Sequence, residues 1–244
     1  GYTIQPYSPA AGTGLSTHEL NQPGSYRNVK DNTVVAQFKV RNNTDHKLIP
    51  ALFGNAKTEV FILAWTTTPW TLPSNTALAV GKHIDYVLVN TFNPYTYEPV
   101  KVIVGKPLFG KYFPEKNAEM AMDEYVPGQK AIPFEILAEF TGADLAGLRY
   151  EQLLPYALPE SGDAFRVITG DFVTTEDGTG IVHIAPSFGA DDFKVAKQNG
   201  IGALTLVDKT GRFTEEMGEF AGRYVKSEYA ADNDPMKDEN VDVD

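Results

Sequence analysis

Cysteine is absent from this chain of 244 residues, and histidine is scarce. Without cysteine the chain has no disulfide bond, no thiolate nucleophile and no cysteine-ligated zinc, a composition that fits a reducing compartment. No two histidines lie within one helical turn of each other, so the usual helical pattern of metal ligands is missing. We therefore expect no metal site. The four histidines are His18, His46, His83 and His183.

A long apolar run is also missing. No stretch of about 18 apolar residues is available to span a membrane, and the first residues lack the pattern of a secretory signal. These absences predict that the protein has no membrane partner and lies in the cytoplasm.

Positive charge is in deficit, since 21 lysines and arginines face 32 acidic residues and the net charge is −11. Phosphate contacts need clustered basic side chains, so a broad nucleic-acid surface is excluded and any RNA contact must be local. Residues 230–244 hold six acidic side chains against Lys237. We predict that they form an acidic connector to the rest of a larger protein.

What remains is ordinary globular composition, with 42% apolar and 11% aromatic residues, enough for one large domain. Residues 1–32 are rich in Gly, Pro, Ser and Thr and predict an irregular lead-in, followed by a domain over 33–229. Helical patterns occur only over 115–124 and 189–199. Many strands and few helices predict a mostly β, barrel-like α+β domain. The predicted strands cover residues 33–41, 59–65, 84–91, 100–104, 134–140, 165–169, 180–185 and 203–207.

One segment rich in hydroxyl groups follows a buried strand. Residues 65–75 read Trp-Thr-Thr-Thr-Pro-Trp-Thr-Leu-Pro-Ser-Asn. Pro69 and Pro73 cannot donate to a sheet, so the strand must leave the sheet there. An irregular exit would let the hydroxyls and amides of Thr66, Thr67 and Thr68 converge. The alternative is that threonine is only a good strand residue at these positions.

A second segment, residues 178–192, places an imidazole and two acids around a strand-to-helix junction. Gly178 and Gly180 permit a tight turn, and a short buried strand then carries His183. Asp191 and Asp192 fall in the first turn of the next helix, where the helix dipole should keep them ionised and able to hold an ammonium group. The alternative is ordinary charge placement beside a core histidine. We expect the two segments to form one pocket.

Common hydrolase and nucleotide-binding motifs fail on this sequence. Residues 185–189 resemble a nucleophile elbow, but no histidine follows Ser187, so the serine, acid, histidine order of an α/β-hydrolase is impossible. The glycines of residues 174–180 lack the lysine of a P-loop.

The two segments together resemble the editing domain, connective peptide 1, that is inserted into isoleucyl-tRNA synthetase, a class Ia aminoacyl-tRNA synthetase. The resemblance runs from about Asp31 to Tyr229. Related valyl and leucyl editing domains typically carry arginine in the threonine-rich stretch, where this chain has Thr68. The signatures of the family's aminoacylation site, of the HIGH and KMSKS types, are absent. The resemblance therefore implies a fragment that cannot activate an amino acid and needs neither ATP nor another cofactor for editing.

The resemblance implies a barrel-like fold of several short sheets and hydrolysis of valine mischarged on isoleucine tRNA, with valyl-adenylate as a further substrate. The expected partners are the aminoacylated 3′ end of that tRNA, the valine moiety and the remainder of the synthetase. Asp192 matches the family's aspartate that holds the α-ammonium group of the substrate. His183 matches the residue that closes the side-chain pocket to isoleucine. Thr66, Thr67 and Thr68 match the catalytic hydroxyl cluster. The other candidate substrate-binding positions are Trp65, Thr71, Asn75 and Asp191.

Two alternatives remain open at this point. The fragment could bind tRNA or serve as a scaffold without catalysing anything alone, or it could edit another aliphatic aminoacyl-tRNA of the valyl or leucyl type. The residues alone also leave open whether Asp191 or Asp192 faces the pocket.

Overall fold

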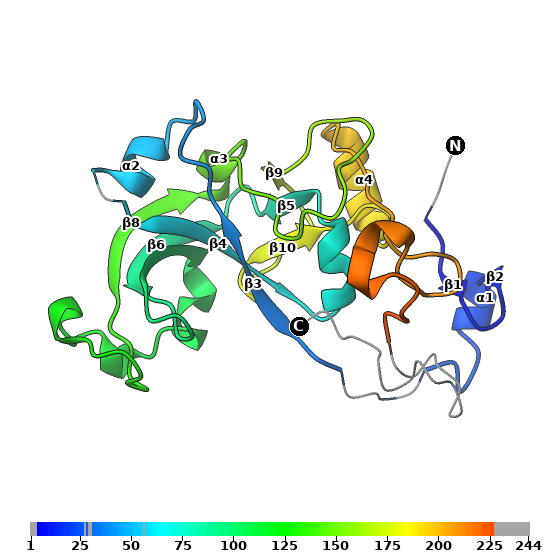
Figure 1. The fold of residues 1–244 in the computed structure, drawn as a ribbon, viewed down its shortest axis with the longest axis horizontal. Helices are drawn as coiled ribbons and strands as arrows, with labels where there is room; N and C mark the ends of the chain where they lie inside the picture. Colours follow the sequence, from blue (N-terminus) through cyan, green and yellow to red (C-terminus); the bar gives the residue numbers. More distant parts are fainter. Residues whose placement is uncertain (1–3, 27, 29–30, 56, 227–244) are drawn as a thin grey trace.

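The computed structural model describes residues 4–26, 28, 31–55 and 57–226 (Figure 1). The acidic connector expected over 230–244 lies outside these residues and stays a prediction. Among the described residues, no helix is both long enough and apolar enough to cross a membrane.

The domain is built on one curled, half-barrel sheet of eight strands (Figure 1). Its order is β8-β6-β7-β4-β10-β5-β9, and β3 pairs with β4. The sheet is mixed, with antiparallel pairs such as β6 with β7 and parallel pairs such as β4 with β10. The strands are β3 (Val34–Lys39), β4 (Glu59–Thr66), β5 (Ala77–Val80), β6 (Asp85–Phe92), β7 (Pro99–Gly105), β8 (Glu135–Thr141), β9 (Arg166–Thr169) and β10 (Ile181–Ile184).

Short helices and turns surround the sheet. A two-stranded ribbon of β1 (Tyr7–Ser8) and β2 (Thr13–Gly14) lies with α1 (Thr17–Leu20) at one end of the molecule (Figure 1). The other α-helices are α2 (Ile49–Phe53), α3 (Gly142–Leu145) and α4 (Ala190–Gln198). The 3₁₀ helices are η1 (Pro69–Ser74), η2 (Lys106–Lys111), η3 (Glu115–Asn117), η4 (Met122–Glu124) and η5 (Glu215–Phe220).

The mostly β, barrel-like prediction is confirmed, and so are seven of the eight predicted strands and the helix near 189–199. The prediction of several short sheets is wrong, because the strands join into one large sheet beside the small ribbon. The short strand β5 was not among the predicted strands. Its four residues are all buried, and so short an apolar run has no periodicity to read.

Two predicted elements are wrong. Residues 203–207 alternate like a strand, but only Val207 forms a bridge, to Phe213. The N–H of Leu206 donates instead to a side chain, Ser74 Oγ, at 3.3 Å, and its carbonyl accepts from Thr214 N–H. The helix predicted over 115–124 is replaced by η3 and η4. Only Asn117 is buried in these turns, so no apolar face stabilises a longer helix.

The lead-in is more regular than predicted. Ser16 caps α1, its hydroxyl accepting from Glu19 N–H while the Glu19 carboxylate accepts from Ser16 N–H. This capping box is legible in the sequence as a serine followed three residues later by a glutamate.

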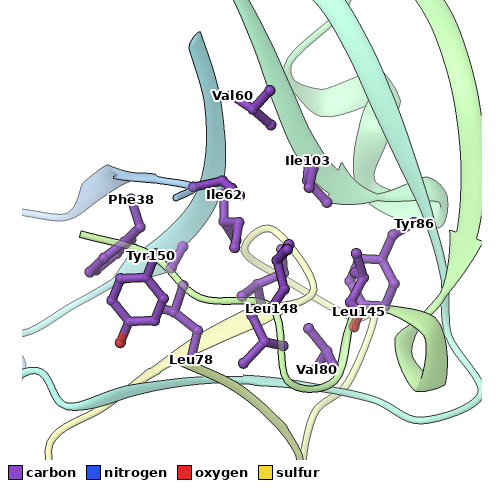
Figure 2. Close-up of a cluster of buried hydrophobic side chains, with 14 of the residues drawn as sticks. Phe38, Val60, Ile62, Leu78, Val80, Tyr86, Ile103, Leu145, Leu148 and Tyr150 are labelled. Atoms are coloured by element: carbon purple, nitrogen blue, oxygen red, sulfur yellow. The ribbon is translucent and has the colours of Figure 1, made fainter. Parts of the chain in front are cut away.

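The main hydrophobic core lies against one face of the sheet (Figure 2). Tyr150 is fully buried inside it, and its ring packs edge-on against Phe38 with centroids 5.3 Å apart. Figure 2 shows the Tyr150 ring beside Phe38 and Leu78, with its hydroxyl at the end of the ring that points away from Ile62. This packing holds a polar atom at a fixed place next to the ends of β5 and β10.

Candidate functional site

The two segments singled out in the sequence are neighbours in space. Strands β4 and β10 pair in parallel, with Val182 opposite Trp65. Side chains alternate between the two faces of a sheet, so Trp65 and Val182 share one face. Thr66 and His183 share the other face, on which the main core lies. The sheet therefore separates Trp65 from His183, although both stood in the predicted site.

The chain leaves the sheet after Thr66, as the prolines predicted. Pro69 occupies the start of η1, and the helix ends where Asn75 N–H donates to the Leu72 carbonyl at 3.0 Å. Trp70 in η1 packs edge-on against Phe188, in the loop after β10, with ring centroids 5.2 Å apart. This contact and the strand pairing bind the two segments into one structural unit.

Three threonines form a hydroxyl cluster at this exit. Thr66 and Thr71 are buried and Thr68 is half-buried. Thr68 Oγ1 lies 3.4 Å from Thr66 Oγ1 and 3.3 Å from Thr71 Oγ1. Thr68 N–H donates to Thr66 Oγ1 at 3.0 Å, and the Thr71 hydroxyl donates to the Thr68 carbonyl at 2.8 Å. Thr67 is exposed and stays outside this cluster.

His183 joins the threonine cluster to a second buried polar group. Its Nε2 lies 2.8 Å from Thr71 Oγ1, and its Nδ1 lies 3.1 Å from Asn75 Nδ2. The side chain is buried, and this burial lowers the pKa of His183 to about 4. The imidazole is therefore neutral at physiological pH.

Asn75 uses both ends of its amide inside the protein. Its Nδ2 donates to the Ala77 carbonyl at 2.9 Å, and its Oδ1 accepts from the Tyr150 hydroxyl at 2.7 Å. Only 2% of Asn75 is exposed. The structure thus places this predicted substrate-binding residue behind His183.

Asp192, and not Asp191, faces the end of β10. Its Oδ2 accepts from the Ala185 N–H at 2.9 Å, whereas Asp191 is exposed. A Cβ atom on Gly189 would lie 2.9 Å from Asp192 Cγ, so glycine leaves room for this carboxylate. Burial, with a smaller effect of the Asp191 charge, raises the pKa of Asp192. Burial therefore opposes the effect expected of the helix dipole, and the ionisation of Asp192 stays a prediction.

Comparison with known proteins decides the family. Isoleucine–tRNA ligase of Cytophaga hutchinsonii is 59% identical over 96% of this chain, and that of Porphyromonas gingivalis is 58% identical over 97%. The chain belongs to the isoleucine–tRNA ligase family. It spans about a fifth of the length of these relatives, covering 21% and 20% of them. A more distant relative, the isoleucine–tRNA ligase of Thermoplasma volcanium, is 38% identical over 92% of the chain and is covered over 18% of its length.

Among solved structures, GlLeuRS-CP1 is matched with a TM-score of 0.48 and 20% identity over 68% of this chain and 58% of that one. The P. knowlesi cytosolic leucyl-tRNA synthetase editing domain gives a TM-score of 0.48 and 14% identity over 68% and 62%. No protein-family model matches the chain. The relatives show that the chain corresponds to one part of an isoleucine–tRNA ligase, and the assignment of that part to the editing domain, made from the two motifs, stays a prediction.

The chemistry available at this site is that of neutral hydrogen-bonding groups, with the Asp192 carboxylate held at the end of β10. A hydroxyl cluster can position water, and a neutral buried imidazole can shape a wall without carrying charge. Trp65 packs instead behind the sheet, where a Cβ on Gly178 would lie 2.9 Å from its Cε3. Tyr150 was missed, because nothing in its local sequence marks it and only the fold brings it to Asn75.

Proposed function

We propose that this editing domain hydrolyses the ester bond of valine mischarged on isoleucine tRNA, in the cytoplasm, with valyl-adenylate as a second substrate. The observation that carries the proposal is the series of side-chain contacts that links Thr66, Thr68, Thr71 and His183. This series joins a hydroxyl cluster that can position water to a neutral, rigidly held imidazole that can form one wall of a pocket. Family membership and the two motifs support the same activity.

The need for a second site is physical. One missing methylene gives a binding site only about 1–3 kcal/mol of discrimination, a limit for which isoleucyl-tRNA synthetase is itself the standard example. A pocket that excludes isoleucine but admits valine removes the error. We assign this exclusion to His183, since hydrogen bonds at both ring nitrogens prevent the imidazole from turning aside.

The reaction is attack by water on the ester carbonyl. Thr66 and Thr68 hydroxyls, with the backbone amides of the exit loop, orient the water and stabilise the developing oxyanion. The bond between the carbonyl carbon and the ribose oxygen breaks. The ribose hydroxyl next to the ester relays a proton from the attacking water to the leaving ribose oxygen. The ionised carboxylate of Asp192 holds the α-ammonium group of the amino acid.

The deciding assay compares release of valine from Val-tRNA(Ile) with release of isoleucine from Ile-tRNA(Ile), using this 244-residue chain at micromolar concentration and low salt. Asp192→Ala should lose most hydrolysis, while Asp191→Ala, which removes an exposed acid from the same helical turn, should keep it. Equal activity in the two variants would refute the role of Asp192.

A second candidate is a tRNA-binding or scaffolding fragment that catalyses nothing alone. The net charge of −11 supports the absence of catalysis, because it weakens RNA affinity and would leave the site unused without the rest of the synthetase. No release above the spontaneous rate would support it. A panel of other mischarged aliphatic tRNAs tests editing of the valyl or leucyl type.

A further inference from the structure

Asn75 is built to act on His183 and not on a ligand. It is only 2% exposed, and its carbonyl oxygen and amide nitrogen both have protein partners. Any influence of Asn75 on a substrate must therefore pass through the imidazole that it touches.

The orientation of the Asn75 amide follows from its neighbours. The Ala77 carbonyl can only accept a hydrogen bond, so the atom 2.9 Å from it must be the donor Nδ2. The Ile184 carbonyl, 3.5 Å from the same atom, demands the same orientation. Oδ1 then faces the Tyr150 hydroxyl, which donates to it.

This orientation decides which nitrogen of His183 carries the proton. Asn75 Nδ2 is a donor, so His183 Nδ1 must be the unprotonated acceptor. The proton of the neutral ring lies on Nε2 and is donated to Thr71 Oγ1. Thr71 can accept it because its own hydroxyl hydrogen is committed to the Thr68 carbonyl. The four hydrogen bonds from Tyr150 to Thr68 therefore share one direction. Each group donates to the next, from the Tyr150 hydroxyl through Asn75, His183 and Thr71 to the Thr68 carbonyl.

Tyr150 is held firmly at the start of this chain. Its ring packs edge-on between Phe38 and Phe165, with centroids 5.3 and 6.2 Å away. Phe165 has a φ of 59°, a left-handed conformation that is rare for a bulky residue. Its N–H donates to the Thr76 carbonyl, and its carbonyl accepts from Tyr150 N–H, so this conformation ties Tyr150 to the segment next to Asn75.

We propose that Tyr150 and Asn75 are a positioning pair that locks neutral His183 as the Nε2–H tautomer and thereby fixes the wall of the editing pocket. The pair sets selectivity without touching the substrate. This consequence for selectivity rests on the proposed function, whereas the tautomer does not.

The tautomer is measured directly by long-range ¹H–¹⁵N NMR of the chain labelled at histidine nitrogens, at pH 7. Wild-type His183 should carry its proton on Nε2 alone. Tyr150→Phe keeps the ring packing but removes the hydrogen bond to Asn75 Oδ1, one of the contacts that fix the amide beside the two carbonyls. We expect the weakened preference for one amide orientation to let a fraction of Nδ1-protonated His183 appear. Asn75→Asp replaces the donor by an acceptor and should place a proton on Nδ1 outright.

Tyr86→Phe is the matched control. It also removes a buried tyrosine hydroxyl, which accepts from Gly81 N–H and donates to the Gly180 carbonyl, but it leaves Asn75 untouched. Its His183 spectrum should equal that of the wild type. In the deacylation assay, Tyr150→Phe should narrow the preference for Val-tRNA(Ile) over Ile-tRNA(Ile) on the order of tenfold, since a loosened wall admits isoleucine.

Two results would overturn the proposal: a proton on Nδ1 in wild-type His183, or an unchanged His183 spectrum in both Tyr150→Phe and Asn75→Asp. Failure of the proposed function is a separate outcome, because it appears as absent valine release in the wild type while the spectra still report the tautomer.

Discussion

The buried neutral His183 should make the stability of this domain depend on pH between neutrality and pH 4. An unfolded histidine has a pKa near 6.5, and burial lowers the pKa of His183 to about 4 in the folded state. Between these two pH values His183 binds a proton in the unfolded chain but not in the folded chain. The free energy of unfolding therefore falls as the pH falls through this window, and His183 contributes no slope above about pH 7.

The magnitude follows from the width of the window. A pKa difference of about 2.5 units corresponds to a loss of about 3 kcal/mol by the time the pH reaches the folded value. About 2 kcal/mol of that is lost between pH 7 and pH 5, where most carboxylates remain ionised. The side chain is only 7% exposed, so solvent screens this effect little.

Urea unfolding at pH 7, 6 and 5 measures the loss. His183→Gln should be less stable at pH 7, because the fit of the imidazole is lost, but its stability should fall less toward pH 5. His83→Gln replaces an exposed histidine and should follow the wild type. If His183→Gln keeps the full wild-type dependence on pH, the argument from burial is refuted.

Three further predictions concern the site and its support. His183→Ala should begin to release isoleucine from Ile-tRNA(Ile), because the side chain that excludes isoleucine is removed. Unchanged selectivity in the deacylation assay would contradict this role of His183. Gly189→Ala should cut valine release about tenfold with little change in urea stability, because its methyl group would push the Asp192 carboxylate aside; full activity would show that the displacement is harmless. Gly142→Ala should destabilise the fold by at least about 2 kcal/mol in urea unfolding, since its Cβ would overlap the backbone carbonyl of Gly81, and a wild-type midpoint would contradict this.

Local sequence determined much of the frame on which the site is built. The two prolines after Thr68 forced β4 to leave the sheet, and the glycines before Ile181 and the proline after Ala185 set the limits of β10. The same two stretches carry the resemblance to isoleucyl-tRNA synthetase, and the comparison over 96% of the chain shows that family. These features were readable because proline and glycine act through their own backbone, whatever packs around them.

The tertiary structure alone decided which of these residues meet. Side chains alternate along any strand, but only the pairing of Val182 with Trp65 placed Trp65 on the face opposite His183. The family resemblance had selected Asp192 over Asp191, but only the packing of α4 gave the physical reason, because adjacent residues of a helix point in different directions. Tyr150 reaches Asn75 across 75 residues of chain. Burial and hydrogen bonding at such distances depend on the register of the whole sheet, and no local pattern records that register.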